Sequence, residues 1–283
     1  MFLQEIVFMR YLLTILFSFS FISTLLSTPL QDRRLEKAAL LELAKKLQIP
    51  EDEDLMIGTQ KKWLRNHGQE RWEMEQTLSP EDRAFVVDWA QKKGLYSPWT
   101  PCKTTYDKAL ILGATTSCMQ KRLDYLTTLW EEGVRFDKIV WLTGKRPLDA
   151  KIDGLLDSCK NESEAARVIW EKASLPEEMR KIPILFIEVE MKKEGNNLKR
   201  PNTQDTIIAF LEVEPEPCRA LFVSDQPFCG YQDAIIAGSL SQDFLFDTVG
   251  PGVDPSSHPL AAVITLDSIS RWIYQDELNN KKK

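Results

Sequence analysis

The sequence ALILGATTSCMQKRLDYLTTLWEEG, residues 109–133, decides the fold. It starts with a short apolar run that is typical of a buried strand and passes through the small residues Gly113–Ser117. It then continues as a helix with Leu123, Leu126 and Trp130 on one face. A strand, a short loop and an amphipathic helix form the first half of a βαβ unit. The segment therefore predicts an α/β domain.

The same alternation of apolar runs and amphipathic segments extends along the chain on both sides of this segment. The predicted strands are 108–112, 138–143, 183–189, 220–224, 244–249 and 261–266, and the predicted helices are 120–132, 163–173, 203–212, 231–240 and 268–278. Runs such as ILFI and AAVITL are apolar throughout, as expected for strands that helices cover on both faces. Residues 102–283 therefore predict a Rossmann-like, doubly wound α/β domain with a mostly parallel sheet.

Residues 29–101 predict a helical region that packs on the main domain. Leu35, Leu43 and Leu47 recur at helical spacing. The run Ser79-Pro80-Glu81-Asp82 predicts the start of a later helix, because a serine cap is followed by a proline in the first turn and a reciprocal carboxylate. That helix is expected to end near Gly94.

Residues 1–28 predict a signal peptide or a membrane anchor. The run YLLTILFSFSFISTLL, residues 11–26, carries no charge and follows Arg10. Its length suits the apolar part of a signal peptide and is slightly short for a bilayer span. Cleavage near Ser27 and retention both stay open, as do Met1 and Met9 as the start. We therefore expect an exported protein, either periplasmic or anchored in the inner membrane.

Composition argues against several functional classes. The net charge is −6 and the one strongly basic run is 281–283, which argues against nucleic-acid binding. The histidines are His67 and His258, and neither G-x-S-x-G nor H-E-x-x-H occurs, so we predict no Ser-His-Asp triad and no metal site. The five cysteines form no C-x-x-C pair. The residues indicate no particular cofactor or protein partner.

Candidate site residues follow four predicted strands, because open parallel sheets bind ligands at the carboxyl ends of their strands. The four segments are Gly113–Ser117, Thr143–Arg146, Arg200–Thr203 and Ser224–Phe228. Free backbone N–H groups after Gly113 suit an anion, although a plain turn with a helix cap has the same pattern. Asn202 or Thr203 also fits an ordinary helix cap.

With these segments, residues 107–254 resemble the YdcF/SanA/ElyC-like family of Rossmann-like proteins. The similar motifs are the glycine loop and Arg122-Leu123 after the first strand, KIVWLTG, Asn161–Ala166 with Glu164 as the preferred glutamate, Arg200–Thr203, and ALFVSDQPF. The chain departs from the family pattern at Cys229 and Gln232, where the family has a histidine and an arginine. Residues 191–199 look like an insertion.

The resemblance implies a role in the cell envelope, in peptidoglycan or lipid-carrier metabolism, with a small anionic or phosphorylated ligand. In this hypothesis Asp225 and Glu164 orient hydroxyl groups or move protons. The expected ligand-binding residues are Gly113, Ala114, Thr115, Thr116, Arg122, Gly144, Asn202, Thr203, Ser224 and Gln226. Two alternatives stay open: a non-enzymatic envelope-integrity factor that acts through protein partners, and a cytoplasmic S-adenosylmethionine-binding protein.

Overall fold

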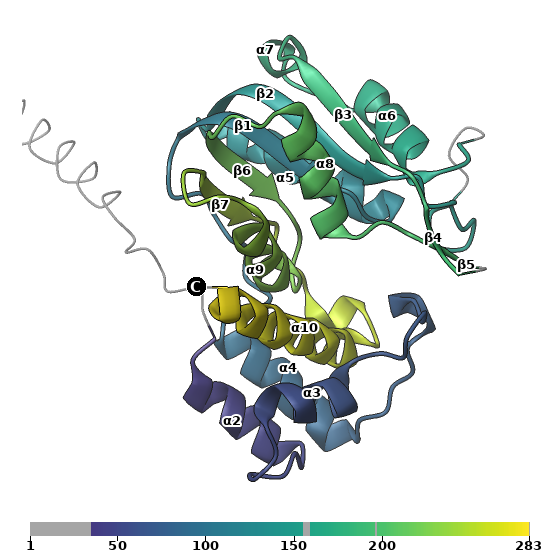
Figure 1. Ribbon diagram of the computed structural model, residues 1–283, viewed down its shortest axis with the longest axis vertical. Helices are drawn as coiled ribbons and strands as arrows, with labels where there is room; N and C mark the ends of the chain where they lie inside the picture. Colours follow the sequence, from purple (N-terminus) through teal and green to yellow (C-terminus); the bar gives the residue numbers. More distant parts are fainter. Residues whose placement is uncertain (1–34, 155–158, 196, 283) are drawn as a thin grey trace, which may run out of the picture. The chain divides into compact units, whose positions relative to one another are not determined.

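Five parallel strands form the central sheet of the computed structural model, which describes residues 35–154, 159–195 and 197–282 (Figure 1). The strands are β1 (Thr105–Leu112), β2 (Arg135–Gly144), β3 (Ile184–Val189), β6 (Arg219–Val223) and β7 (Leu245–Val249). Ala109 of β1 lies opposite Ile139 of β2 and opposite Leu221 of β6. The predicted α/β fold with a parallel sheet is confirmed.

The strand order is β3-β2-β1-β6-β7. The chain moves outward from β1 to β3, returns to place β6 beside β1, and continues to β7. The order therefore reverses between β1 and β6, and such a switch point is where doubly wound sheets bind ligands, outside the carboxyl ends of the strands.

Helices cover both faces of the sheet, and the strand period of two divides its apolar side chains between them. Ala109 and Ile111 belong to one buried cluster, which includes side chains of α5 (Thr116–Glu131), α6 (Glu162–Lys172) and α7 (Glu177–Arg180). Leu110 and Leu112 belong to the opposite cluster, with α8 (Thr203–Val213) and α9 (Cys229–Ser239). The sheet is therefore doubly wound, as predicted.

One predicted strand is wrong. Residues 261–266 form the first turns of α10 (Ala261–Lys282), not a strand. The run AAVITL contains β-branched residues that favour strands. However, Ala262, Leu266 and Ile269 recur at helical spacing and are buried together in a third apolar cluster. Packing against the N-terminal helices therefore outweighs the local preference.

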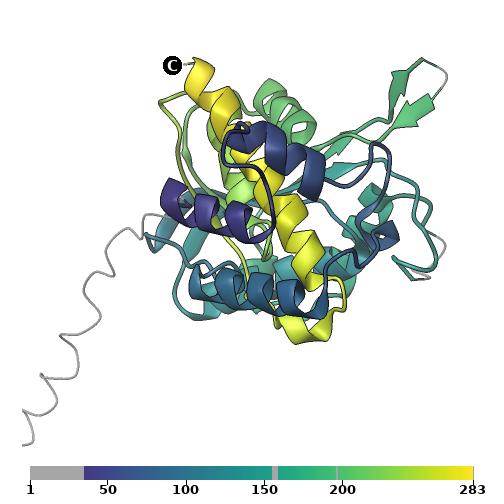
Figure 2. The ribbon, with the colours of Figure 1, turned by 90° about the horizontal axis from the view of Figure 1, so that it is seen from below.

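The third cluster joins the start of the described chain to its end. It combines α10 with side chains of α2 (Lys37–Lys46), α3 (Leu55–Trp63) and α4 (Pro80–Lys92), and α10 crosses α3 in Figure 2. Ser79 caps α4 by accepting a hydrogen bond from the Asp82 backbone N–H at 3.0 Å. A short 3-10 helix, η1 (Arg71–Glu73), lies between α3 and α4 in the chain. Residues from Leu35 onward form one compact unit.

Two further features complete the described chain. The stretch that looked like an insertion, 191–199, contains an antiparallel pair, β4 (Lys192–Glu194) and β5 (Asn197–Lys199). A 3-10 helix, η2 (Pro255–Ser257), precedes α10. The predicted signal peptide or anchor, residues 1–28, lies outside the described residues. Within the described ranges, no helix is both long and apolar enough to cross a membrane.

Candidate functional site

An ion pair crosses the switch point. Arg122 of α5 is 2% exposed, and its Nε donates to Asp225 Oδ1, after β6, at 2.8 Å. Its Nη2 also pairs with Asp225, and its Nη1 donates to the carbonyl oxygens of Leu112 and Gly113 at 2.7 and 3.0 Å. Burial alone lowers the pKa of Arg122, but the Asp225 carboxylate outweighs it and the pKa is raised. Arg122 therefore ties the end of β1 to the end of β6.

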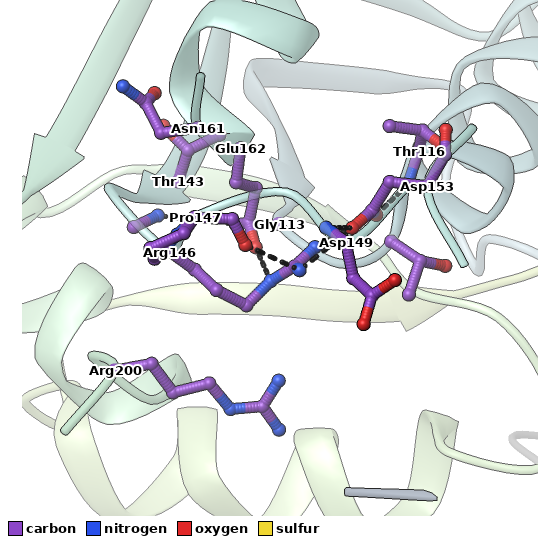
Figure 3. Close-up of polar contacts among 12 residues, drawn as sticks. Gly113, Thr116, Thr143, Arg146, Pro147, Asp149, Asp153, Asn161, Glu162 and Arg200 are labelled. Carbon is purple, nitrogen blue, oxygen red and sulfur yellow. Dashed lines mark hydrogen bonds and ion pairs between the residues drawn. The ribbon is translucent and has the colours of Figure 1, made fainter. Parts of the chain in front are cut away.

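A second charged group lies after β2 (Figure 3). Arg146 donates from Nη1 and Nη2 to the two oxygens of Asp153 at 2.9 and 3.0 Å, and from Nε to Glu162 Oε2 at 3.3 Å. Glu162 Oε1 accepts from the Gly144 backbone N–H at 3.2 Å. All three charged side chains are buried. Burial raises the pKa of Glu162, and Arg146 opposes that rise only in part.

Asp153 occupies the start of α5, where the sequence predicted an anion. Its Oδ1 accepts from the Thr116 backbone N–H at 3.1 Å, and its Oδ2 accepts from the Asp149 backbone N–H at 2.9 Å. Burial alone would raise the pKa of Asp153, but the hydrogen bonds from Arg146 and these backbone groups lower it. A helix N-terminus favours negative charge, and here the chain itself supplies that charge.

The two glycines at the strand ends allow close packing. A Cβ on Gly113 would lie 2.2 Å from Glu162 Oε1 and 2.6 Å from the Leu142 carbonyl oxygen. A Cβ on Gly144 would lie 2.4 Å from Pro201 Cγ. Both positions therefore need glycine. The close approach at Gly144 is to the Arg200–Thr203 segment, so two of the four predicted segments are in contact.

The segment after β6 is buried and held by the chain. Ser224 donates its hydroxyl to the Gln232 side-chain oxygen, and Gln226 donates from Nε2 to the Ser97 carbonyl oxygen at 2.9 Å. Gln232 therefore binds Ser224. Cys229 is fully buried, and burial raises the pKa of its thiol.

Glu164 supports the N-terminal cap of α6 instead of joining the charged group. Its carboxylate accepts from the Lys160 backbone N–H at 2.7 Å and from Asn161 Nδ2 at 2.9 Å, while Asn161 caps α6. The glutamate that reaches Arg146 is Glu162. The spacing Asn161-x-x-Glu164 matches a helix-capping pattern, so the sequence did contain the signal that separates the two glutamates.

The remaining predicted residues have structural contacts. Asn202 caps α8 and forms a capping box with Asp205, and Thr203 is the first residue of that helix. Thr115 precedes α5 as its N-cap residue, without a side-chain capping bond. Ala114 packs against the apolar cluster on the α5 face. The structure thus places Ala114 and Thr115 beside the switch point and gives Asn202 a capping role.

The helical N-terminal layer reaches the same edge of the sheet. Arg200, before α8, pairs with Glu70 at 3.1 Å, and the guanidinium of Arg71 lies 3.8 Å from the centre of the Phe228 ring. Sequence reasoning missed Arg71 and Asp153 as site residues. Neither has a local pattern that marks it, because each reaches the edge only through the way its segment folds back.

The opposite edge of the sheet also has a hollow. A surface hollow at the amino ends of the strands is lined by Thr105, Tyr106, Asp107, Arg135, Asp137, Pro217, Cys218, Arg219, Asp243 and Leu245. We place the candidate site at the carboxyl ends, because the buried charged groups and the switch point lie there. In the part of the chain that the structure describes, no cluster of histidine, cysteine and acidic residues is arranged to hold a metal ion.

No protein-family model matches the chain, and neither a curated protein nor a solved structure matches it. The fold itself defines the class: the chain is a Rossmann-like, doubly wound α/β protein. Because a fold of this kind hosts many unrelated functions, function has to be argued from the groups at the switch point.

Proposed function

We propose that this protein binds a small anionic, phosphorylated ligand at the carboxyl edge of its sheet, as an exported or membrane-anchored member of the YdcF/SanA/ElyC-like family in cell-envelope metabolism. The observation that carries the proposal is the pair of buried charged groups on either side of Gly113, Arg122–Asp225 and Arg146–Asp153–Glu162. Burying charges is costly even when they are paired. Perturbed ionisable groups of this kind cluster at functional sites.

The groups divide into two roles in this proposal. Arg122 and Asp225 hold the two halves of the sheet in register, because the donors of Arg122 are directed at the chain. Glu162 is the group that can carry or release a proton in this proposal, since burial raises its pKa. The phosphate group of a ligand would compete with Asp153 for Arg146 and for the start of α5.

Ligand binding tests this proposal directly. The full chain is titrated with inorganic pyrophosphate and with a short-chain polyprenyl phosphate, and the thermal midpoint is measured. We expect a phosphate-bearing compound to raise the midpoint of the wild type, because a ligand that binds the folded state stabilises it. An R146Q variant should show a smaller rise. The absence of any rise in the wild type would contradict the proposal.

A specific observation also favours a second candidate, a non-enzymatic envelope factor that acts through protein partners. Asp153 fills the start of α5 and binds Arg146, so the charged group is satisfied without a ligand. E162Q separates the candidates: an envelope phenotype that survives this substitution favours the binding factor, and its loss favours ligand chemistry.

Export has its own test, because it depends on residues 1–28. A reporter that is active only outside the cytoplasm is fused after the N-terminal segment. We expect activity, since an uncharged apolar run after an arginine directs export. An inactive reporter would favour the cytoplasmic alternative.

A further inference from the structure

Three arginines surround one buried carboxylate beside the carboxyl edge. Asp267 of α10 has no exposed side-chain surface. It accepts from the Arg65 backbone N–H at 3.2 Å, from Arg65 Nη1 at 3.1 Å and from Arg271 Nε at 3.1 Å. Arg71 approaches the same carboxylate, with its Nε 3.9 Å from Asp267 Oδ2. The three cations come from the residues after α3, from η1 and from α10.

Arg71 differs from the other two cations because its guanidinium makes no hydrogen bond to the described residues. Its Nε is buried without a hydrogen-bond partner, and its side chain is 29% exposed. Burial lowers the pKa of Arg71 to about 10, and repulsion from Arg65 and Arg271 adds to that effect against the attraction of Asp267. The guanidinium therefore has donors left for another acceptor.

The charges around Asp267 do not balance. Three guanidinium groups face one carboxylate, which leaves an excess of two positive charges. The neighbouring pair Arg200–Glu70 adds no net charge. Arginine has a planar fork of donors that matches two phosphate oxygens, so an excess of two favours a doubly charged phosphate over a single carboxylate.

The position of Arg71 connects this cluster to the candidate site. Its guanidinium stacks on Phe228, three residues after Asp225 and next to the cis peptide bond between Gln226 and Pro227. Its neighbour Glu70 pairs with Arg200, which precedes the proline that packs on Gly144. The cluster and the two strand ends are thus linked by direct contacts, although they come from distant parts of the sequence.

We propose that Arg71, supported by Arg65 and Arg271, binds the dianionic phosphate monoester group of the ligand. This inference rests on the proposed function and adds to it the class of group recognised and the residues that recognise it. Arg71 contacts the phosphate. Arg65 and Arg271 hold Asp267, which positions the cluster. The helical layer then supplies part of the binding site.

The test compares R71Q with R83Q in the full chain. Arg83 is an exposed arginine of α4 in the same helical layer and serves as the matched control. Calorimetric titration with phenyl phosphate measures binding, and a thermal melt measures stability. We expect R71Q to weaken binding at least tenfold while its melting midpoint stays equal or rises, because a repelling cation is removed. R83Q should match the wild type, and R71K should recover part of the affinity.

The outcomes separate this inference from the function on which it rests. If R71Q binds phenyl phosphate as tightly as the wild type, the inference is wrong and the proposed function stands. If R71Q instead lowers the melting midpoint and leaves affinity unchanged, Arg71 is structural. If the wild type binds no phosphate compound, the proposed function fails and the inference fails with it.

Discussion

At the scale of single residues, the switch point depends on two positions with opposite requirements. Gly113 has no room for a side chain because Glu162 and the end of β2 approach it. Glu162 keeps a charged side chain in a place that penalises charge. Each requirement explains the other, since the missing Cβ makes the space that the carboxylate fills.

Gly113→Ala should destabilise the protein by about 1–3 kcal/mol, the usual cost of forcing an extra methyl into a packed site. Urea denaturation measures the loss. The same substitution in an E162A background should still be destabilising, because the Leu142 carbonyl oxygen would remain 2.6 Å from the new Cβ. Full recovery in that background would show that only the carboxylate excludes a side chain.

Glu162 should make the free energy of unfolding depend on pH. Its pKa in the folded protein is raised above 4.5, so its contribution to stability is complete below that pH and is lost as pH rises through the folded-state value. The free energy of unfolding of the wild type relative to E162Q should therefore fall as pH rises. Denaturant titrations across acidic to neutral pH measure it, with the exposed Glu171→Gln as a control for losing one carboxylate. A difference that grows with pH would refute this assignment.

At the scale of elements, Asp153 attaches the loop after β2 to α5, because its carboxylate accepts from the Thr116 backbone N–H and its backbone carbonyl oxygen accepts from the Thr116 hydroxyl at 2.6 Å. Asp153 joins Arg146, the Asp149 backbone and the first turn of α5. The carboxylate therefore contributes to the position of the loop against the helix. The same contacts keep the start of α5 closed to outside anions until something displaces Asp153.

Asp153→Ala should cost about 3–5 kcal/mol, because removing one partner of a buried pair leaves Arg146 poorly compensated. Asp149→Ala, in the same loop but exposed, should change stability little. The pKa of Asp153 is lowered in the folded protein, so its contribution to the free energy of unfolding is present above pH 3.8. That contribution is lost as pH falls through the pKa of Asp153 in the folded protein. Chemical denaturation at neutral and acidic pH checks both statements. Equal effects of the two alanines would mean that the ion pair contributes nothing.

Most elements could be predicted because their signals are local. The five strands are apolar runs of the right length, and Ser79 marks its helix by capping chemistry. The helical start of α10 could not be predicted, because AAVITL has the composition of a strand. It becomes helical through packing against α3 and α4. At the site, the loop after β1 and the segment with Asp225 were predicted to share an edge, and an ion pair between Arg122 of α5 and Asp225 links them. Asp153 and Arg71 reach that edge by long-range folding, which no local spacing encodes.

At the scale of the whole molecule, the helical layer is part of the same compact unit as the sheet. It shares an apolar cluster with α10, and Ala234 of α9 belongs to that cluster too. The layer and α10 therefore form a third apolar core that contributes to stability. The layer also places Arg71 at the carboxyl edge of the sheet.

A chain that begins at Lys103 should not unfold in a single cooperative transition. It should also bind a dye specific for exposed apolar surface, because Leu266, Ile269 and Trp272 would no longer be covered by the N-terminal helices. A chain that begins at Leu35 keeps the whole compact unit and is the matched control. Circular dichroism melts and dye fluorescence distinguish the two. A cooperative melt of the shorter chain would show that the sheet is independent of the layer.

The packing of α10 against α3 and α4 also sets an order of events during synthesis. The first helices of the unit leave the ribosome long before the last one, so their apolar faces have no final partner until about two hundred residues later. The apolar faces of these helices therefore stay uncovered by α10 for most of the synthesis of the chain. The contact that closes the third apolar cluster cannot form before the C-terminal helix has been made.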